Sequence, residues 1–222
     1  VLDDKYQTTV KGLYVIGSLA GYPLIKQAMN QGYDVVEYIL GHTIKPADYP
    51  LLELQFGLMP YRKEAEEILN LFLSRIPMFA ELSPLTFREL IIESHLWVSL
   101  DGEAYDDALP TAEKLAETAA AQNPSPKYGK LIKAGEYVYR AGEYSSTFFT
   151  IVEGEVEIEV PTRPDLEIVL KRGEFFGETS LLTGKPRLGS VIARKDCILV
   201  ETPRRTMLKL MNSNANVKQG ID

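Results

Sequence analysis

The sequence is poor in groups that build metal, disulfide or membrane sites: it contains one cysteine, two histidines and no long apolar run. With Cys197 alone, the chain can form neither an intrachain disulfide nor a Cys-x-x-Cys redox pair, so we expect a reducing, cytoplasmic setting. His42 and His95 are isolated from each other and from any acidic cluster, which argues against a metal site. The longest apolar runs, residues 13–16 and 198–200, are far shorter than the roughly 20 residues of a transmembrane helix, so no membrane partner is expected.

An excess of basic residues is also lacking. The chain has 24 Lys and Arg residues against 31 Asp and Glu residues, which gives a formal charge of −7. Nucleic-acid binding depends on clustered Lys and Arg side chains that neutralise backbone phosphates, so we expect no nucleic-acid partner. No nucleophile–base pair or pair of carboxylates stands at a workable spacing either. These absences favour a binding protein over an enzyme.

A length of 222 residues allows one good core, or one core with a smaller appendage. Residues 1–45 predict a short buried strand at 13–17 and an amphipathic helix over about 23–40, a unit too small to fold alone. The helix has an apolar stripe of Leu24, Ala28, Val35 and Ile39. Because Val1 stands where an initiator Met would be, we interpret the chain as a piece of a longer protein.

Residues 46–76 predict a proline-containing linker and a connecting helix. The apolar face of that helix comprises Ile68, Leu71, Phe72 and Ile76. A third helix is predicted in the segment "MFAELSPLTFRELIIESHLW", with Ser83 as its N-cap and Pro84 at its first position.

Residues 77–222 are predicted to form the main domain. An acidic, alanine-rich stretch at about 100–127 predicts an exposed helical insert. From Leu131 onward, short alternating runs are separated by Gly-Glu turns, and acidic and apolar residues alternate over 155–160. The final stretch begins as a helix. This pattern predicts an α+β fold, an antiparallel β jelly roll with flanking helices.

The stretch "GEFFGETSLLTGKPRLGSV" at residues 173–191 places charged residues and glycines in an apolar setting. It makes a long crossover inside the predicted barrel, which indicates a functional loop. Backbone amides after Gly177 can approach a phosphate, and the planar fork of Arg187 can bind two phosphate oxygens. The Glu178 carboxylate can accept hydrogen bonds from a ribose diol. Together these residues predict a site for a sugar that carries a phosphate.

This stretch resembles the phosphate-binding cassette of cyclic nucleotide-binding domains, the family of the protein kinase A regulatory subunits and the bacterial catabolite activator proteins. The matching residues are Phe176, Gly177, Glu178, Thr179, Ser180, Leu181, Pro186 and Arg187. The resemblance covers about residues 77–212 apart from the insert. It implies that Glu178 binds the ribose 2′-hydroxyl, that Arg187 binds the cyclic phosphate, and that amides near Ser180 and Leu188 contact phosphate oxygens. The candidate ligand-binding residues are Phe176, Gly177, Glu178, Thr179, Ser180, Pro186, Arg187, Leu188 and Gly189.

Leu188 departs from the family pattern, which usually has Ala, Ser or Thr after the arginine. A threonine there is the family's usual guanine contact, so the resemblance favours cAMP over cGMP as the ligand. Family members cover the base with a helix after the barrel, and here that helix should be starting near Asp222. Two alternatives remain: a surface ion pair between Glu178 and Arg187 in a barrel that binds nothing, and an interaction module without a ligand.

Aromatic residues surround this stretch. Tyr139, Tyr144, Phe148, Phe149, Phe175 and Phe176 could stack on a purine, but we expect most of them in the barrel core. Trp97 is expected to have a packing role.

The amino-terminal stretch resembles the closing strand and helix of the flavin domain in pyridine nucleotide-disulfide oxidoreductases of the thioredoxin reductase type. The residues that carry this resemblance are "TTVKGLYVIGSLAGYPLIKQAMNQGYDVVEYILG". Ser18 replaces the Asp that contacts the flavin in that family, so FAD is expected only in a longer parent, which could be an oxidoreductase. Any buried strand followed by an amphipathic helix could produce the same pattern by chance. A homodimer through the flanking helices also stays open.

Overall fold

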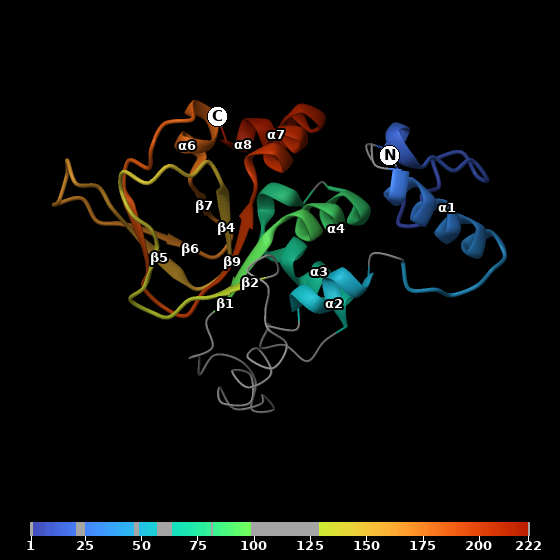
Figure 1. Ribbon diagram of the computed structural model, residues 1–222, viewed down its shortest axis with the longest axis horizontal. Helices are drawn as coiled ribbons and strands as arrows, with labels where there is room; N and C mark the ends of the chain where they lie inside the picture. Colours follow the sequence, from blue (N-terminus) through green and yellow to red (C-terminus); the bar gives the residue numbers. More distant parts are fainter. Residues whose placement is uncertain are drawn as a thin grey trace.

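A computed structural model of the chain describes residues 2–20, 25–46, 49–56, 64–80, 82–98 and 129–221. In Figure 1 the strands form a barrel, helices α2, α3, α4 and α7 lie beside it, and α1 lies at the far end of the molecule. The predicted insert at about 100–127 lies outside the described residues. No helix within the described ranges is both long and apolar enough to cross a bilayer.

The amino-terminal segment contains the 3-10 helix η1 (Gly17–Ala20) and helix α1 (Ile25–Ile39). The predicted strand at 13–17 is wrong, because only Tyr14 makes an isolated bridge, with Gln7, and Leu13 is exposed. A strand needs a continuous neighbour to pair with, and the described part of this segment offers none. Helix α1 is confirmed, although its predicted start lies outside the described residues. Within the predicted stripe, Val35 is buried but Ile39 is exposed.

Helices α2 (Tyr49–Phe56), α3 (Ala65–Arg75) and α4 (Pro84–Glu93) and the 3-10 helix η2 (Pro77–Phe79) precede the barrel. Helix α2 was not predicted, because the prolines around it indicated a linker. The predicted cap is confirmed: Ser83 Oγ accepts a hydrogen bond from the Thr86 backbone N–H at 3.1 Å. The third helix ends before the end of its predicted segment, since strand β1 begins at His95.

Two sheets form the barrel. Among the described residues one sheet has the order β2-β1-β9-β4-β7 and the other the order β3-β8-β5-β6. All pairs are antiparallel except β1 with β2, which is parallel. The α+β jelly-roll fold is therefore confirmed. The strands are β1 (His95–Val98), β2 (Gly129–Leu131), β3 (Tyr137–Tyr139), β4 (Phe148–Glu153), β5 (Glu155–Glu159), β6 (Ile168–Lys171), β7 (Phe175–Phe176), β8 (Ser190–Ala193) and β9 (Ile198–Thr202).

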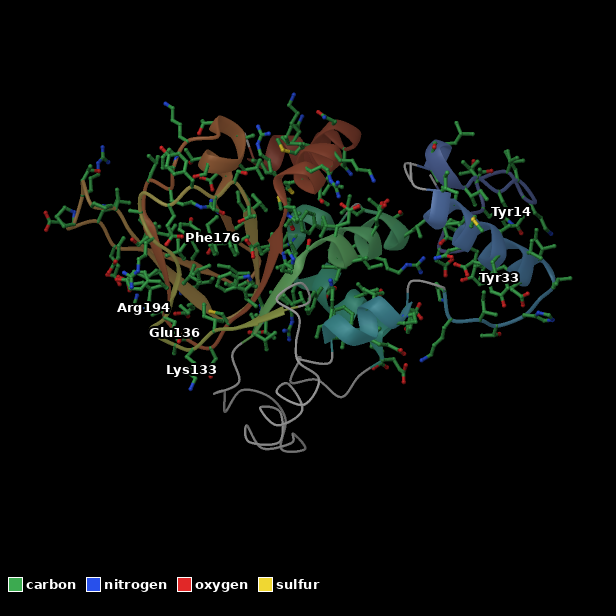
Figure 2. The ribbon with its side chains drawn as sticks, viewed as in Figure 1. Tyr14, Tyr33, Lys133, Glu136, Phe176 and Arg194 are labelled. Atoms are coloured by element: carbon green, nitrogen blue, oxygen red, sulfur yellow. The ribbon has the colours of Figure 1, made fainter. Side chains whose placement is uncertain are left out.

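An aromatic cluster fills the barrel interior. The rings of Phe149 and Phe176 stack with centroids 4.9 Å apart, and Trp97 meets Phe149 edge-on at 5.7 Å. Figure 2 shows Phe176 inside the barrel and Arg194 at its outer surface. The expected core role of most of these aromatics is confirmed, but Tyr144 is exposed.

A second core joins the helices to the five-stranded sheet, with Phe72, Phe79 and Phe148 fully buried. It also includes residues of α7 (Arg204–Ser213) and α8 (Ala215–Ile221), two helices formed by the stretch that we expected to begin as one. Leu181 of the loop at 177–189 belongs to this second core, so the loop is anchored on the side of the flanking helices.

Candidate functional site

The candidate site begins where β7 ends and the short helix α6 (Glu178–Thr183) starts. Gly177 is the N-cap of α6 and has a φ of 91°, a left-handed conformation that glycine adopts without strain. A Cβ atom at this position would lie 2.6 Å from Arg187 Nη1 and 2.9 Å from the Thr147 carbonyl oxygen. The close approach of the Arg187 guanidinium therefore requires glycine at position 177.

Arg187 is buried, with 3% of its surface exposed. Its Nη1 donates a hydrogen bond to the Gly177 carbonyl oxygen at 3.1 Å. Its Nη2 donates to the Thr147 carbonyl oxygen at 2.8 Å, and lies 3.2 Å from both Thr147 Oγ1 and Ser145 Oγ. The remaining donor, Nε, is buried and has no hydrogen-bond partner among the described residues. The guanidinium is thus firmly positioned, yet its Nε–H is unsatisfied.

The turn between β3 and β4 holds the backbone of Arg187. The Arg187 N–H donates to the Glu143 carbonyl oxygen at 2.9 Å, and the Gly142 N–H donates to the Arg187 carbonyl oxygen at 2.8 Å. The sequence predicts a Gly-Glu turn here, but sequence reasoning missed its contact with Arg187 and its hydroxyl groups, Ser145 and Thr147. Their only sequence indication is the polar run directly before β4, which does not reveal a partner some 40 residues away.

The Arg187 charge lies over an aromatic ring. Its Cζ is 4.1 Å from the ring centroid of Tyr139 and 5.8 Å from that of Phe149, a cation–π geometry. Burial lowers the pKa of Arg187, and nearby Tyr139 and the carboxylates Glu201 and Glu178 partly oppose that effect. A guanidinium stays protonated in proteins, so the site carries a fixed positive charge.

Glu178 is the first residue of α6 and is partly buried. One carboxylate oxygen accepts a hydrogen bond from Thr179 Oγ1 at 3.1 Å. Glu178 lies close enough to Arg187 to influence its pKa. The alternative of a surface ion pair between the two does not hold, because Arg187 is buried and its hydrogen bonds go to residues 145, 147 and 177.

The other predicted site residues occupy different environments. Phe176 and Ser180 are buried, whereas Leu188 is 64% exposed. Thr179 and Pro186 are partly buried. Gly189 packs so closely that a Cβ would lie 2.8 Å from the Glu159 carbonyl oxygen. The structure therefore brings Gly177, Glu178 and Arg187 together and directs Leu188 to the surface.

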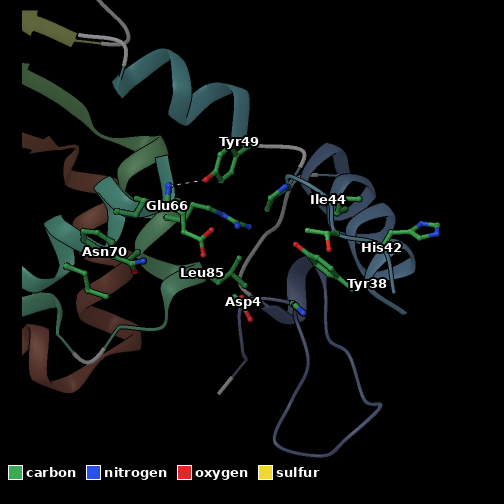
Figure 3. A pocket seen from close by; sticks show the side chains of 15 residues that line it. Asp4, Tyr38, His42, Ile44, Tyr49, Glu66, Asn70 and Leu85 are labelled. Carbon is green, nitrogen blue, oxygen red and sulfur yellow. Dashed lines mark hydrogen bonds between the residues drawn. The ribbon is translucent and has the colours of Figure 1, made fainter. Parts of the chain in front are cut away.

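A separate pocket of about 200 Å³ lies between the amino-terminal segment and helices α2, α3 and α4 (Figure 3). In it the Glu66 N–H donates a hydrogen bond to Tyr49 Oη at 3.0 Å. Its labelled lining residues are Asp4, Tyr38, His42, Ile44, Tyr49, Glu66, Asn70 and Leu85. None of the predicted site residues lines this pocket.

Comparison with known proteins assigns the region that contains the site. The family model described as "Cyclic nucleotide-binding domain" matches residues 130–214. A cAMP-dependent protein kinase regulatory subunit from Mycosarcoma maydis is 32% identical over 114 residues, which are 50% of this chain and 22% of the relative. A cyclic nucleotide-gated potassium channel from Rhizobium etli is 33% identical over 114 residues, 51% of this chain and 31% of the relative.

Human cGMP-dependent protein kinase 2 is 34% identical over 74 residues, which are 30% of this chain and 10% of the relative. The chain thus spans less than a third of the length of each of these three relatives, with shares of 22%, 31% and 10%. The matched segment contains the cassette, the turn that holds Arg187, and most of the barrel strands. Residues 130–214 accordingly match the cyclic nucleotide-binding domain family, to which the similar segments of these relatives point as well.

Proposed function

We propose that this domain is a sensor that binds cAMP through residues 176–189. The main supporting observation is the buried Arg187 guanidinium, which donates to the Gly177 carbonyl oxygen through Nη1 and has an Nε–H donor without a partner among the described residues. A buried donor without a partner costs about 1–3 kcal/mol, and an anionic oxygen would remove that cost. A cyclic phosphate supplies such an oxygen, and a charge-assisted hydrogen bond to guanidinium is among the stronger ones.

The two charged residues have different roles in this proposal. Arg187 binds the cyclic phosphate, and the Glu178 carboxylate accepts a hydrogen bond from the ribose 2′-hydroxyl. Backbone amides near Ser180 and Leu188 contact the phosphate oxygens. The absence of side chains at Gly177 and Gly189, where a Cβ would collide with neighbours, keeps the loop compact around the ligand.

The preference for cAMP depends on Leu188. Its side chain is exposed and apolar, so it offers no hydroxyl to a guanine base. The names of the relatives include both cAMP-dependent and cGMP-dependent kinases, so competition between the two nucleotides is the relevant measurement. We expect cAMP to displace cGMP.

Ligand binding would be transmitted through α6. Arg204, the first residue of α7, donates a hydrogen bond from Nε to the Leu181 carbonyl oxygen in α6 at 2.8 Å. A ligand that favours one position of α6 would therefore also favour one position of α7, and a switch requires such a differential preference.

A longer parent with a reductase-like part is the proposed target of this regulation. It is supported by the resemblance of residues 1–45 and by a contact between that segment and the helices, in which Arg88 Nη2 in α4 donates to Tyr6 Oη at 3.2 Å. The second candidate, a non-catalytic tail of a flavin enzyme, predicts flavin absorbance in a longer protein that does not change with cAMP.

The test is isothermal calorimetry together with thermal shift against cAMP, cGMP and cyclic dinucleotides. Arg187→Ala should weaken cAMP binding by at least about tenfold, because a charged hydrogen bond contributes roughly 1.5–3 kcal/mol. Glu178→Gln should have a smaller effect, since the amide oxygen still accepts a hydrogen bond. Arg194→Ala is the matched control, because Arg194 pairs with Glu167 on the surface.

Arg187→Ala also removes the partner of several buried groups, so Arg187→Lys is measured beside it and folding is checked by circular dichroism. Equal affinity of the folded Arg187 variants and the parent would refute the assignment. No melting shift of the parent with any of these nucleotides would refute binding itself.

A further inference from the structure

Tyr139 is placed beside the candidate site by an irregularity in its strand. It is the last residue of β3 and pairs with Val191 of β8, and the register shifts between Tyr137 and Tyr139. Without that shift, two residues at this spacing would lie on the same face of the sheet. A bulge redirects side chains, and here the two tyrosines have different surroundings.

The two tyrosines differ in what their hydroxyl groups contact. Tyr137 Oη donates a hydrogen bond to the exposed Glu159 carboxylate at 3.3 Å, and its ring lies under Arg140, 3.6 Å from Cζ to the ring centroid. The Tyr139 ring instead lies under Arg187, whose Cζ is 4.1 Å from the ring centroid. Tyr137 is thus a natural control for Tyr139: same residue type, same strand, also stacked on an arginine, but paired with a surface carboxylate.

The Tyr139 ring is fixed in place by its neighbours. Besides the guanidinium above it, Phe149 and Phe176 pack at centroid distances of 5.8 and 5.9 Å. A ring held on several sides presents its hydroxyl in one direction, so little side-chain entropy is lost when the hydroxyl meets a partner.

The Tyr139 hydroxyl has no hydrogen-bond partner among the described residues, and it is not among their fully buried unsatisfied atoms, so it keeps access to its surroundings. Burial raises the pKa of Tyr139 to about 12, with Arg187 lowering it and Glu178 raising it. The hydroxyl is therefore protonated at neutral pH and can donate a hydrogen bond. The guanidinium that lies over the Tyr139 ring belongs to Arg187, the central residue of the candidate site.

We propose that Tyr139 is a third ligand-binding side chain, whose hydroxyl donates a hydrogen bond to the cyclic phosphate next to Arg187. This inference rests on the proposed function. In this arrangement the phosphate has two side-chain donors. The Arg187 guanidinium neutralises its charge, and the Tyr139 hydroxyl adds a neutral hydrogen bond from the ring that packs under the guanidinium.

The experiment compares Tyr139→Phe with Tyr137→Phe in the whole chain, using calorimetry with cAMP. Both changes delete one oxygen and keep the ring, so the stacking with arginine persists. A donor to a charged acceptor predicts a loss of about tenfold in cAMP affinity for Tyr139→Phe. Tyr137→Phe should leave the affinity within about twofold of the parent, since its hydroxyl pairs only with a surface carboxylate.

A second ligand, 2′-deoxy-cAMP, identifies the contacted group. If Tyr139 binds the phosphate, the Tyr139→Phe penalty stays near tenfold with this analogue, although Glu178 has lost its own partner. If the penalty falls below about twofold, the hydroxyl contacts the ribose and the proposal is overturned. Melting temperature and circular dichroism are followed in parallel, because a purely structural hydroxyl would change melting without changing affinity.

The two levels of the proposal fail in different ways. A parent chain that binds no cyclic nucleotide overturns both the proposed function and the role of Tyr139. A parent that binds cAMP and loses affinity with Arg187→Lys, while Tyr139→Phe binds like the parent, overturns only the role of Tyr139.

Discussion

Apolar residues are buried in the barrel, whereas many of them are exposed in the amino-terminal segment. In the barrel, Phe148 and Ile151 are fully buried, and both lie on β4, which pairs with β9 on one side and β7 on the other. In the amino-terminal segment, Leu19 is 90% exposed, Ile25 80% and Met29 70%. Apolar content alone therefore does not make a core. A residue is buried only where a second layer of structure covers it.

Helix α1 shows the difference within one element. Val35 packs against Tyr6 and Leu85 in a small cluster. A second group of apolar residues on α1 is exposed. Its members are three or four positions apart and therefore lie on one face of the helix: Ile25, Met29, Tyr33 and Val36. The barrel, by contrast, is closed by strand pairs between residues far apart in the sequence, such as β1 with β9. Long-range pairing is what turns a pattern of apolar residues into a rigid support for Arg187.

The largest expected effect on the free energy of unfolding comes from replacing a barrel aromatic residue with alanine, compared with the same change in α1. Phe149→Ala should reduce the free energy of unfolding by about 3–5 kcal/mol, because it leaves a cavity between Trp97, Tyr139 and Phe176. Tyr33→Ala in the exposed face of α1 should change it by less than about 0.5 kcal/mol. Urea unfolding followed by tryptophan fluorescence measures both, and equal losses would contradict the contrast between a closed and an open region.

A smaller effect is expected from two glycines with nearly the same backbone conformation. Gly177 has a φ of 91° and Gly142 a φ of 88°, but only at Gly177 would a Cβ meet neighbouring atoms. Both Ala variants carry the strain of a positive φ, about 1–2 kcal/mol. Gly177→Ala should cost about 1–3 kcal/mol more in unfolding free energy, and weaken cAMP binding, because it displaces the Arg187 guanidinium. If both variants unfold and bind alike, the close approach at Gly177 has no consequence.

An effect that is absent near neutral pH and appears only in alkaline solution is expected from a titrating group in the barrel wall. Burial raises the pKa of the Cys197 thiol from 9.0 to about 11. As the pH rises above 9, the unfolded chain releases this proton before the folded chain does, so the contribution to stability is present below pH 9 and is lost as the pH rises through 11. The loss should reach about 2–3 kcal/mol at most.

Chemical unfolding at a series of alkaline pH values measures the Cys197 effect. Cys197→Ser is the control, because a hydroxyl does not ionise in this range while other groups titrate as before. An identical pH dependence in the parent and the variant would show that Cys197 is not the responsible group. In the folded parent at pH 8, the buried thiol should also react slowly with a thiol reagent.

The sequence was sufficient for the local features. The N-cap at Ser83 is a local hydrogen bond, the jelly-roll strands follow from alternation and turns, and the glycine at 177 with its neighbouring acid forms a compact motif. Two local predictions failed for lack of tertiary information. The strand at 13–17 had the right residues but pairs only at Tyr14, with Gln7. Helix α2 contains Pro50 in its first turn, yet it gained a buried face from Leu52 and Phe56.

The sequence by itself determined which groups are available: a fixed cation, a carboxylate, a glycine between strand and helix, and a set of aromatic rings. Only the tertiary structure decided how they meet. It brought Ser145 and Thr147 to the Arg187 guanidinium, left Nε unpaired, and placed Tyr139 beneath the charge through a shift in strand register. The physical reason is that hydrogen bonds and ring contacts depend on distance in space, whereas propensity and capping depend on distance along the chain.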